Sequence, residues 1–186
     1  MHHIHGKGTI EKYLKASGLA HAILRPVAFF ENFDDAANYN PLTKGSLKFL
    51  TMDPVYLVAT YDLGVAAAAM LNDKPAWSGK TLSCSSWKGS LAEVAAALEA
   101  VSGDKTVGKL AMPLWARSCM LSDLNAMCLY FEGGYKDSTV SIEEFKKVVP
   151  NAMDPAAWFR YHGKYASAPL AAPLFPFNHL AACRQT

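Results

Sequence analysis

The sequence predicts an α/β protein with a parallel sheet and a small helical lobe at its C-terminal side. Residues 6–16 carry apolar side chains at helical spacing, Gly18 suits the left-handed end of a helix, and residues 21–26 form an apolar run typical of a buried strand. A helix, a glycine turn and a buried strand in this order are the second half of a βαβ unit. After residue 113 the patterns are helical.

The composition is that of a folded protein and excludes several partner classes. The chain has 186 residues, of which 51% are hydrophobic and 18% are charged, so it can build a core of about one domain. Its net charge of +2 lacks the basic excess of nucleic-acid-binding proteins. No apolar run reaches the about 18 residues of a membrane span, and residues 1–7 lack a secretory signal. We therefore expect a cytoplasmic protein, with the nucleus as a second compartment.

Residues 27–90 are expected to hold a loop, two groups of strands and one helix. The loop at 27–40 is rich in aromatic side chains and Asn, and the strand-like stretches at 47–58 are interrupted by Pro54. Asp62 is the expected N-cap of an Ala-rich helix, because a carboxylate accepts the free N–H groups of a first turn. A turn over 72–79 then leads to a strand over 80–85.

The C-terminal half is predicted to be mainly helical. Two capping boxes, Ser90 to Glu93 and Ser141 to Glu144, mark helix starts, and Asp154 precedes a last helix. A strand is expected over 106–111, and residues 166–186 show no period and read as a loosely structured tail. The expected helices span residues 90–101, 113–132, 141–150 and 155–161.

The strongest binding candidates follow the strand at 21–26. Phe29, Phe30, Glu31 and Asn32 leave its carboxyl end, which is where open α/β sheets bind ligands. The two Phe rings could wall a planar ligand or belong to the core. Glu31 and Asn32 could hold polar groups of a cofactor, or they could fix the loop.

Two further groups of residues lie near the N-terminus. Lys7 is on the first expected helix, with His3 one turn before it, and a lone lysine there is typical of a surface. His2, His3 and His5 have no nearby thiol or carboxylate, so we expect no metal site.

These stretches together resemble the NmrA-like family of the atypical short-chain dehydrogenase/reductases, and most of all its NADPH-sensing members. The resemblance covers the first 164 residues or so, from which we expect residues 1–165 to be one NmrA-like unit. It is carried by residues 3–14 and 17–19, Leu24-Arg25-Pro26, Phe29-Phe30-Glu31-Asn32, Asp62-Leu63-Gly64, the strand after Trp77-Ser78-Gly79-Lys80 and the helix from Ser90.

The resemblance implies an NAD(P)-binding Rossmann-like fold, of which this chain is the C-terminal part. It implies that Lys7 approaches the nicotinamide ribose of NADP(H) or NAD(H), and that Phe29, Phe30, Glu31 and Asn32 line the same end of the cofactor. His3 stands where the reductases carry their catalytic Tyr. A histidine can donate a proton, so His3 is the candidate catalytic residue if the protein is an enzyme.

The phosphate-binding part of the family pattern is missing. Neither GxGxxG nor GxxxxGK[ST] occurs in the sequence, so we expect a truncated form that binds the cofactor weakly or not at all. Its truncated sheet should expose an edge to a protein partner or a second copy. Three functions stay open: a redox-sensing regulator, an NAD(P)H-dependent oxidoreductase acting on a quinone or another carbonyl, and a cofactor-free protein-interaction module.

Overall fold

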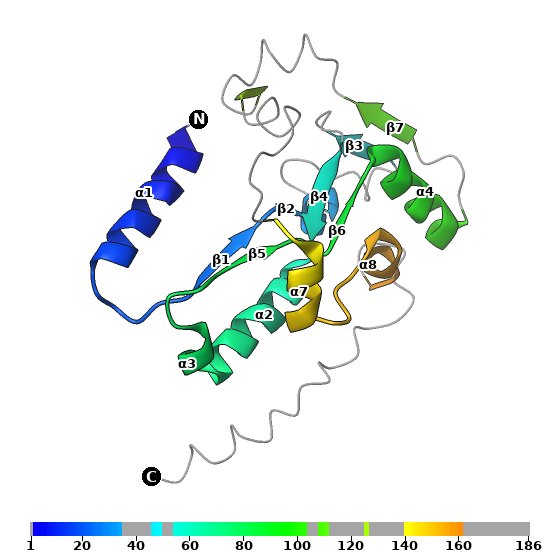
Figure 1. The fold of residues 1–186 in the computed structure, drawn as a ribbon. Coiled ribbons are helices and arrows are strands. Elements are labelled where there is room, and N and C mark those ends of the chain that lie inside the picture. The colour runs from blue at the N-terminus through cyan, green and yellow to red at the C-terminus, as the bar shows by residue number, and fades with distance from the viewer. Residues whose placement is uncertain are drawn as a thin grey trace.

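The computed structural model describes residues 2–34, 46–49, 54–103, 108–111, 125–126 and 140–161 (Figure 1). Its helices are α1 (His2–Ala16), the 3₁₀ helix η1 (Phe30–Asp34), α2 (Thr60–Asn72), α3 (Lys74–Trp77), α4 (Leu91–Ser102), α7 (Ile142–Val148) and α8 (Pro155–Tyr161). Its strands are β1 (Ile23–Pro26), β2 (Ala28–Phe29), β3 (Ser46–Phe49), β4 (Val55–Val58), β5 (Thr81–Cys84), β6 (Trp87–Gly89) and β7 (Gly108–Ala111).

Strands β1 and β5 form a parallel pair whose register runs from Ile23 opposite Thr81 to Pro26 opposite Cys84. Both strands lie in the apolar runs from which the sequence predicted them. The chain between the two strands contains α2 and α3, which form part of the long crossover connection that parallel pairing requires. The predicted α/β class with a parallel sheet is therefore confirmed.

A second group of strands continues this pair. The order is β2-β4-β6, with β2 parallel to β4 and β4 antiparallel to β6. Only Val27 separates β1 from β2, and Ser85 and Ser86 separate β5 from β6. Strand β2 continues the chain after β1, and β6 continues it after β5. These two strands are not paired with each other, because β4 lies between them. A further parallel pair joins β3 and β7.

One face of the β1–β5 pair is packed against helices. Leu82 and Cys84 belong to a buried cluster that includes Met70 of α2 and Phe145 of α7. Burial raises the pKa of the Cys84 thiol to about 12. Side chains alternate along a strand, so Arg25 is on the opposite face, where it donates two hydrogen bonds to Glu11 of α1 at 2.9 and 2.6 Å.

A second cluster joins η1 to the C-terminal helices. Phe30 is fully buried and stacks on Trp158 of α8, with ring centroids 5.8 Å apart. Phe33 and Phe159 stack at 6.3 Å, and Leu98 of α4 is buried in the same cluster. Aromatic contacts of this kind bind the helical lobe to the strand layer.

The helix caps agree with the sequence in part. Ser90 and Glu93 form the predicted capping box, and Asp154 accepts the Ala157 N–H at 2.7 Å. Ser141 accepts the Glu144 N–H at 3.1 Å, but the Glu144 carboxylate pairs with Lys147 and does not close the box.

Several predicted boundaries were wrong. Helix α1 begins before residue 6, the loop expected over 27–40 contains β2 and η1, and α3 lies within the turn expected over 72–79. The predicted strands at 47–58, 80–85 and 106–111 correspond to β3, β4, β5 and β7. Most of the helix expected over 113–132, and all of the tail at 166–186, lie outside the described residues. No helix in the described part is long and apolar enough to cross a membrane.

Asp62 is not the N-cap that the sequence predicted. Helix α2 starts at Thr60 after Ala59, which places Asp62 inside the first turn. Its side chain is only 1% exposed and accepts the Met153 N–H at 2.8 Å, joining α2 to the segment before α8. Burial raises the pKa of Asp62 from 3.8 to about 6, the Met153 hydrogen bond opposes this, and the nearby Glu31 charge adds to it.

The Asp62→Asn variant should flatten the pH dependence of stability between about pH 4 and 7. Because the folded-state pKa is raised, the stabilisation from this group is complete below pH 3.8 and is lost as the pH rises through about 6. The amide keeps an acceptor for Met153 and has no charge to desolvate. At pH 8 the variant should therefore gain on the order of 2 kcal/mol in urea unfolding.

Asp62→Ala is the matched variant. It should also flatten the profile, but it should lower stability at every pH by about 1 to 3 kcal/mol, because the buried Met153 N–H loses its acceptor. A profile of Asp62→Asn that runs parallel to that of the parent protein would contradict the assignment.

Candidate functional site

The candidate site is the corner formed by β2 and η1, where the chain leaves the carboxyl end of β1. In open parallel sheets, ligands bind beyond the carboxyl ends of the strands. Strand β2 pairs with β4, so that Phe29 lies opposite Val58. Helix α2 begins two residues after Val58, and its N-terminus is therefore beside the corner.

Glu31 holds this corner together. Its carboxylate accepts the Thr60 N–H, at 3.0 Å to Oε1 and 3.1 Å to Oε2, and the Trp158 indole N–H at 3.2 Å. A carboxylate is stabilised at a helix N-terminus, where backbone N–H groups lack partners. Of the two interpretations that the sequence left open for Glu31, these contacts correspond to fixing the loop.

The other corner residues differ in exposure. The Phe30 ring lies wholly inside the aromatic cluster, so it presents no surface to a ligand in this structure. Phe29 is half-buried and packs against the cluster around Val58 and Phe145. Asn32 is exposed. Asn32 and part of Phe29 are thus the predicted side chains that a ligand could reach here.

Lys7 and His3 lie on α1, which Figure 1 shows at the blue end of the chain, apart from β2 and β4. Lys7 is exposed. The His3 side chain is outside the described part of the structure. No described contact joins Lys7 to the corner, so a cleft shared by Lys7 and Asn32 stays a prediction.

Two groups near the corner make contacts that the sequence did not predict. Ser86 is buried at the carboxyl end of β5, and its hydroxyl donates to the Met153 carbonyl at 2.7 Å. Asp62 binds the N–H of the same residue and is close enough to Glu31 for their charges to repel. The only sequence signal for Ser86 is a serine pair directly after an apolar strand.

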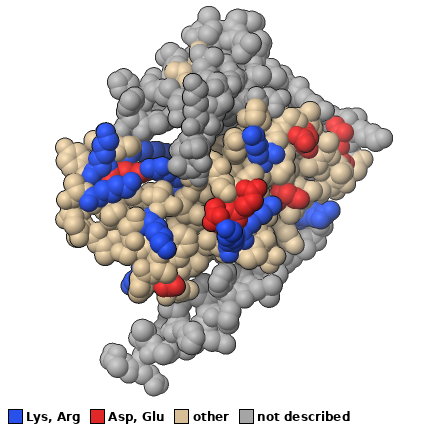
Figure 2. Space-filling view, in the orientation of Figure 1, with Lys and Arg blue, Asp and Glu red and all other residues tan. Residues whose placement is uncertain are grey.

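Charges of both signs are mixed on the face in Figure 2, where Lys and Arg side chains lie among Asp and Glu. The described residues contain no group of three or more His, Cys, Asp or Glu that could hold a metal ion.

Comparison with known proteins places this architecture in a structural class. No protein-family model and no curated protein sequence matches the chain. A nucleoside-diphosphate-sugar epimerase from Staphylococcus aureus is similar in structure, with a TM-score of 0.62 and 19% identity over 81% of this chain and 55% of that chain. The structural neighbours are Rossmann-like proteins, so the predicted Rossmann-like α/β fold is confirmed, and the chain matches about half the length of this neighbour.

NmrA, a negative transcriptional regulator, has the same fold. Its complex with NADP matches at a TM-score of 0.56, and its complex with NAD at 0.57. Each is 16% identical to this chain and aligns over 81% of this chain and 54% of NmrA. The resemblance to NmrA-like proteins is confirmed for the fold, and the chain spans about half the length of these neighbours.

Glu31→Ala should destabilise the protein by about 1 to 3 kcal/mol, because the Thr60 N–H and the Trp158 indole N–H would lose their acceptor. Glu31→Gln keeps one oxygen and should cost less. Asn32→Ala, at the exposed neighbouring position, should change stability by less than about 0.5 kcal/mol. Urea unfolding followed by tryptophan fluorescence measures all three, and equal stabilities of the Glu31→Ala and Asn32→Ala variants would refute this role.

Proposed function

We propose that this chain is the nicotinamide-side part of an NAD(P)-associated regulatory protein of the NmrA-like kind, whose output is a redox-dependent protein contact. The observation that carries the proposal is the position of the corner, at the carboxyl end of β1 and beside the N-terminus of α2. This is the place where open α/β sheets bind ligands. The solved complexes of NmrA with NADP and NAD, which share this fold, support the choice of cofactor.

The residues of the corner divide into two roles under this proposal. Asn32 and the exposed part of Phe29 line the nicotinamide pocket, and Lys7 contacts the nicotinamide ribose from α1. Glu31 and Phe30 do not contact the ligand. They position the corner, because their contacts with Trp158 fix it to α8.

A regulatory role is favoured over catalysis by the residue four positions before Lys7. His3 stands where the resemblance places the catalytic Tyr of the reductases. Affinity for a dinucleotide depends strongly on its pyrophosphate, which Rossmann folds bind at a Gly-rich turn and a helix N-terminus. The sequence contains no such turn, so the chain by itself should bind the cofactor weakly.

Isothermal titration with NADPH tests this proposal on the chain as it stands and on a version joined to an N-terminal strand–glycine turn–helix half. The joined version should bind, and Lys7→Ala should weaken its binding about tenfold, as expected for the loss of a charged hydrogen-bond donor.

Lys12→Ala on the same helix is the control and should leave the affinity unchanged, because Lys12 is also exposed and has no assigned role. Absence of binding by the joined version, or equal effects of the two substitutions, would exclude the nicotinamide-side assignment.

A second function, self-association, is favoured by the exposed apolar residues around α1. Ile10, Tyr13 and Leu19 are 67%, 76% and 66% exposed. Within the described residues, β1 pairs on one side only, with β5. Exposed apolar groups beside an open strand edge are typical of an interface. We infer that a second copy of the chain covers this surface.

Analytical ultracentrifugation should show a dimer that Ile10→Glu and Tyr13→Glu disrupt, because each places a charge in the interface. Leu71→Glu is the matched control, since Leu71 is also 67% exposed but lies on α2. A protein concentration of about 100 µM is far above the Kd of a stable dimer. If the protein is monomeric at that concentration, this role is ruled out.

A further inference from the structure

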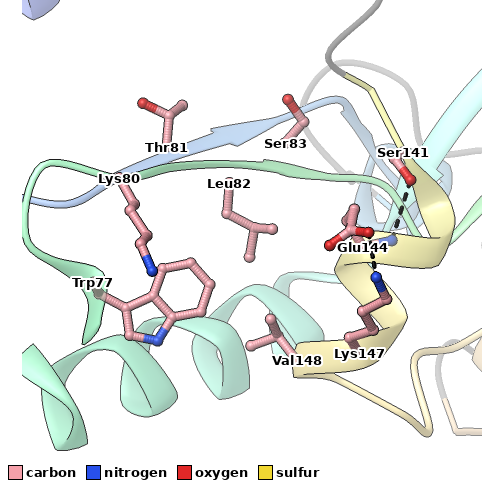
Figure 3. A pocket seen from close by; sticks show the side chains of 9 residues that line it. All are labelled: Trp77, Lys80, Thr81, Leu82, Ser83, Ser141, Glu144, Lys147 and Val148. Carbon is pink, nitrogen blue, oxygen red and sulfur yellow. Dashed lines mark hydrogen bonds and ion pairs between the residues drawn. The ribbon is translucent and has the colours of Figure 1, made fainter.

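A hollow between β5, α3 and α7 lies on the packed face of the sheet and shares no residue with the corner. Its volume is about 400 Å³, which is within the range of small-molecule sites. In Figure 3 the side chains of Lys80 and Leu82 point from the β5 side toward Trp77 and Val148, whereas those of Thr81 and Ser83 point away. The hollow is therefore shaped by two helices and one strand.

The inner wall of this hollow is apolar. Leu82 forms part of it and is only 6% exposed, and Val148 of α7 packs against the same buried cluster. Trp77, at the end of α3, contributes a half-buried indole ring. An apolar wall that includes an indole ring suits a planar ligand, because aromatic groups bury large areas in offset or edge contacts.

The rim carries an excess of positive charge. On the α7 side, Lys147 forms an ion pair with Glu144, one turn earlier on the same helix. The Lys80 ammonium lies 6.0 Å from the centroid of the Trp77 ring, and no carboxylate of the described residues pairs with it. Two ammonium groups therefore face one carboxylate, and Lys80 is the cation left to bind an incoming anion.

We propose that this hollow binds a planar aromatic anion. The ring packs against Trp77 and Leu82, and the acid group binds the Lys80 ammonium. A charge-assisted hydrogen bond at the rim and an apolar contact below it select for a ligand that has both parts. An aromatic carboxylate and a nucleotide share this chemistry. The inference does not depend on the corner or on the proposed cofactor.

NMR titration of the full chain with 2-naphthoate tests the proposal, with the Trp77 indole N–H as the reporter. Saturable shifts are expected at Trp77. The Lys80→Gln variant should bind about tenfold more weakly, because the charged donor is lost. Trp77→Leu, followed by the backbone signals of β5, should weaken binding as well. A second titration with AMP tests whether the ligand is a nucleotide. If AMP shifts the Trp77 signal, the natural ligand is a nucleotide. If 2-naphthoate binds and AMP does not, the ligand is an aromatic carboxylate.

The controls distinguish a specific binding site from non-specific binding. Lys88→Gln removes another exposed lysine over an aromatic ring, 4.9 Å from the Tyr56 centroid, and should leave the affinity unchanged. 2-Naphthylmethanol and inorganic phosphate, which each lack one part of the ligand, should bind more weakly than 2-naphthoate. The proposal is overturned if neither 2-naphthoate nor AMP gives saturable shifts, if Lys80→Gln binds as tightly as the parent, or if either partial ligand binds equally well.

Discussion

The parallel pairing of β1 with β5 is the constraint from which the rest of the architecture follows. Two parallel strands cannot be joined by a tight turn, so the chain after Pro26 has to return along the sheet before it enters Thr81. That return supplies β4, α2 and α3. It also brings the carboxyl ends of both strands to one edge, where the corner and the buried Ser86 lie.

Two carboxylates attach the C-terminal lobe to this edge. Glu31 binds Trp158 of α8, and Asp62 binds Met153 in the segment that leads into α8. Asp62 is buried, and the nearby Glu31 charge makes its ionised form less favourable. The arrangement persists because the N–H groups of Met153 and Trp158 would otherwise lack acceptors, and leaving such buried donors unpaired is costly.

The sequence predicted those elements whose signals are local. The capping box at Ser90 and the apolar run of β1 depend on neighbouring residues, and both were found as expected. The role of Asp62 could not be predicted, because its partner Met153 is 91 residues away. The same holds for Glu31, whose donors come from Thr60 and Trp158. At the corner, residue types could be recognised, but only the fold shows which of them are already engaged.

The attachment of Glu31 to two distant segments also affects how the molecule fluctuates. Its carboxylate cannot leave Thr60 without disturbing the indole of Trp158, and that ring is stacked on Phe30. Local opening of η1 therefore requires α8 to undock, so amide hydrogen exchange in these two segments should follow a single cooperative unit. Helix α1 is joined to β1 by the ion pair between Glu11 and Arg25, outside this cooperative unit. Its amide hydrogens should therefore exchange independently and faster.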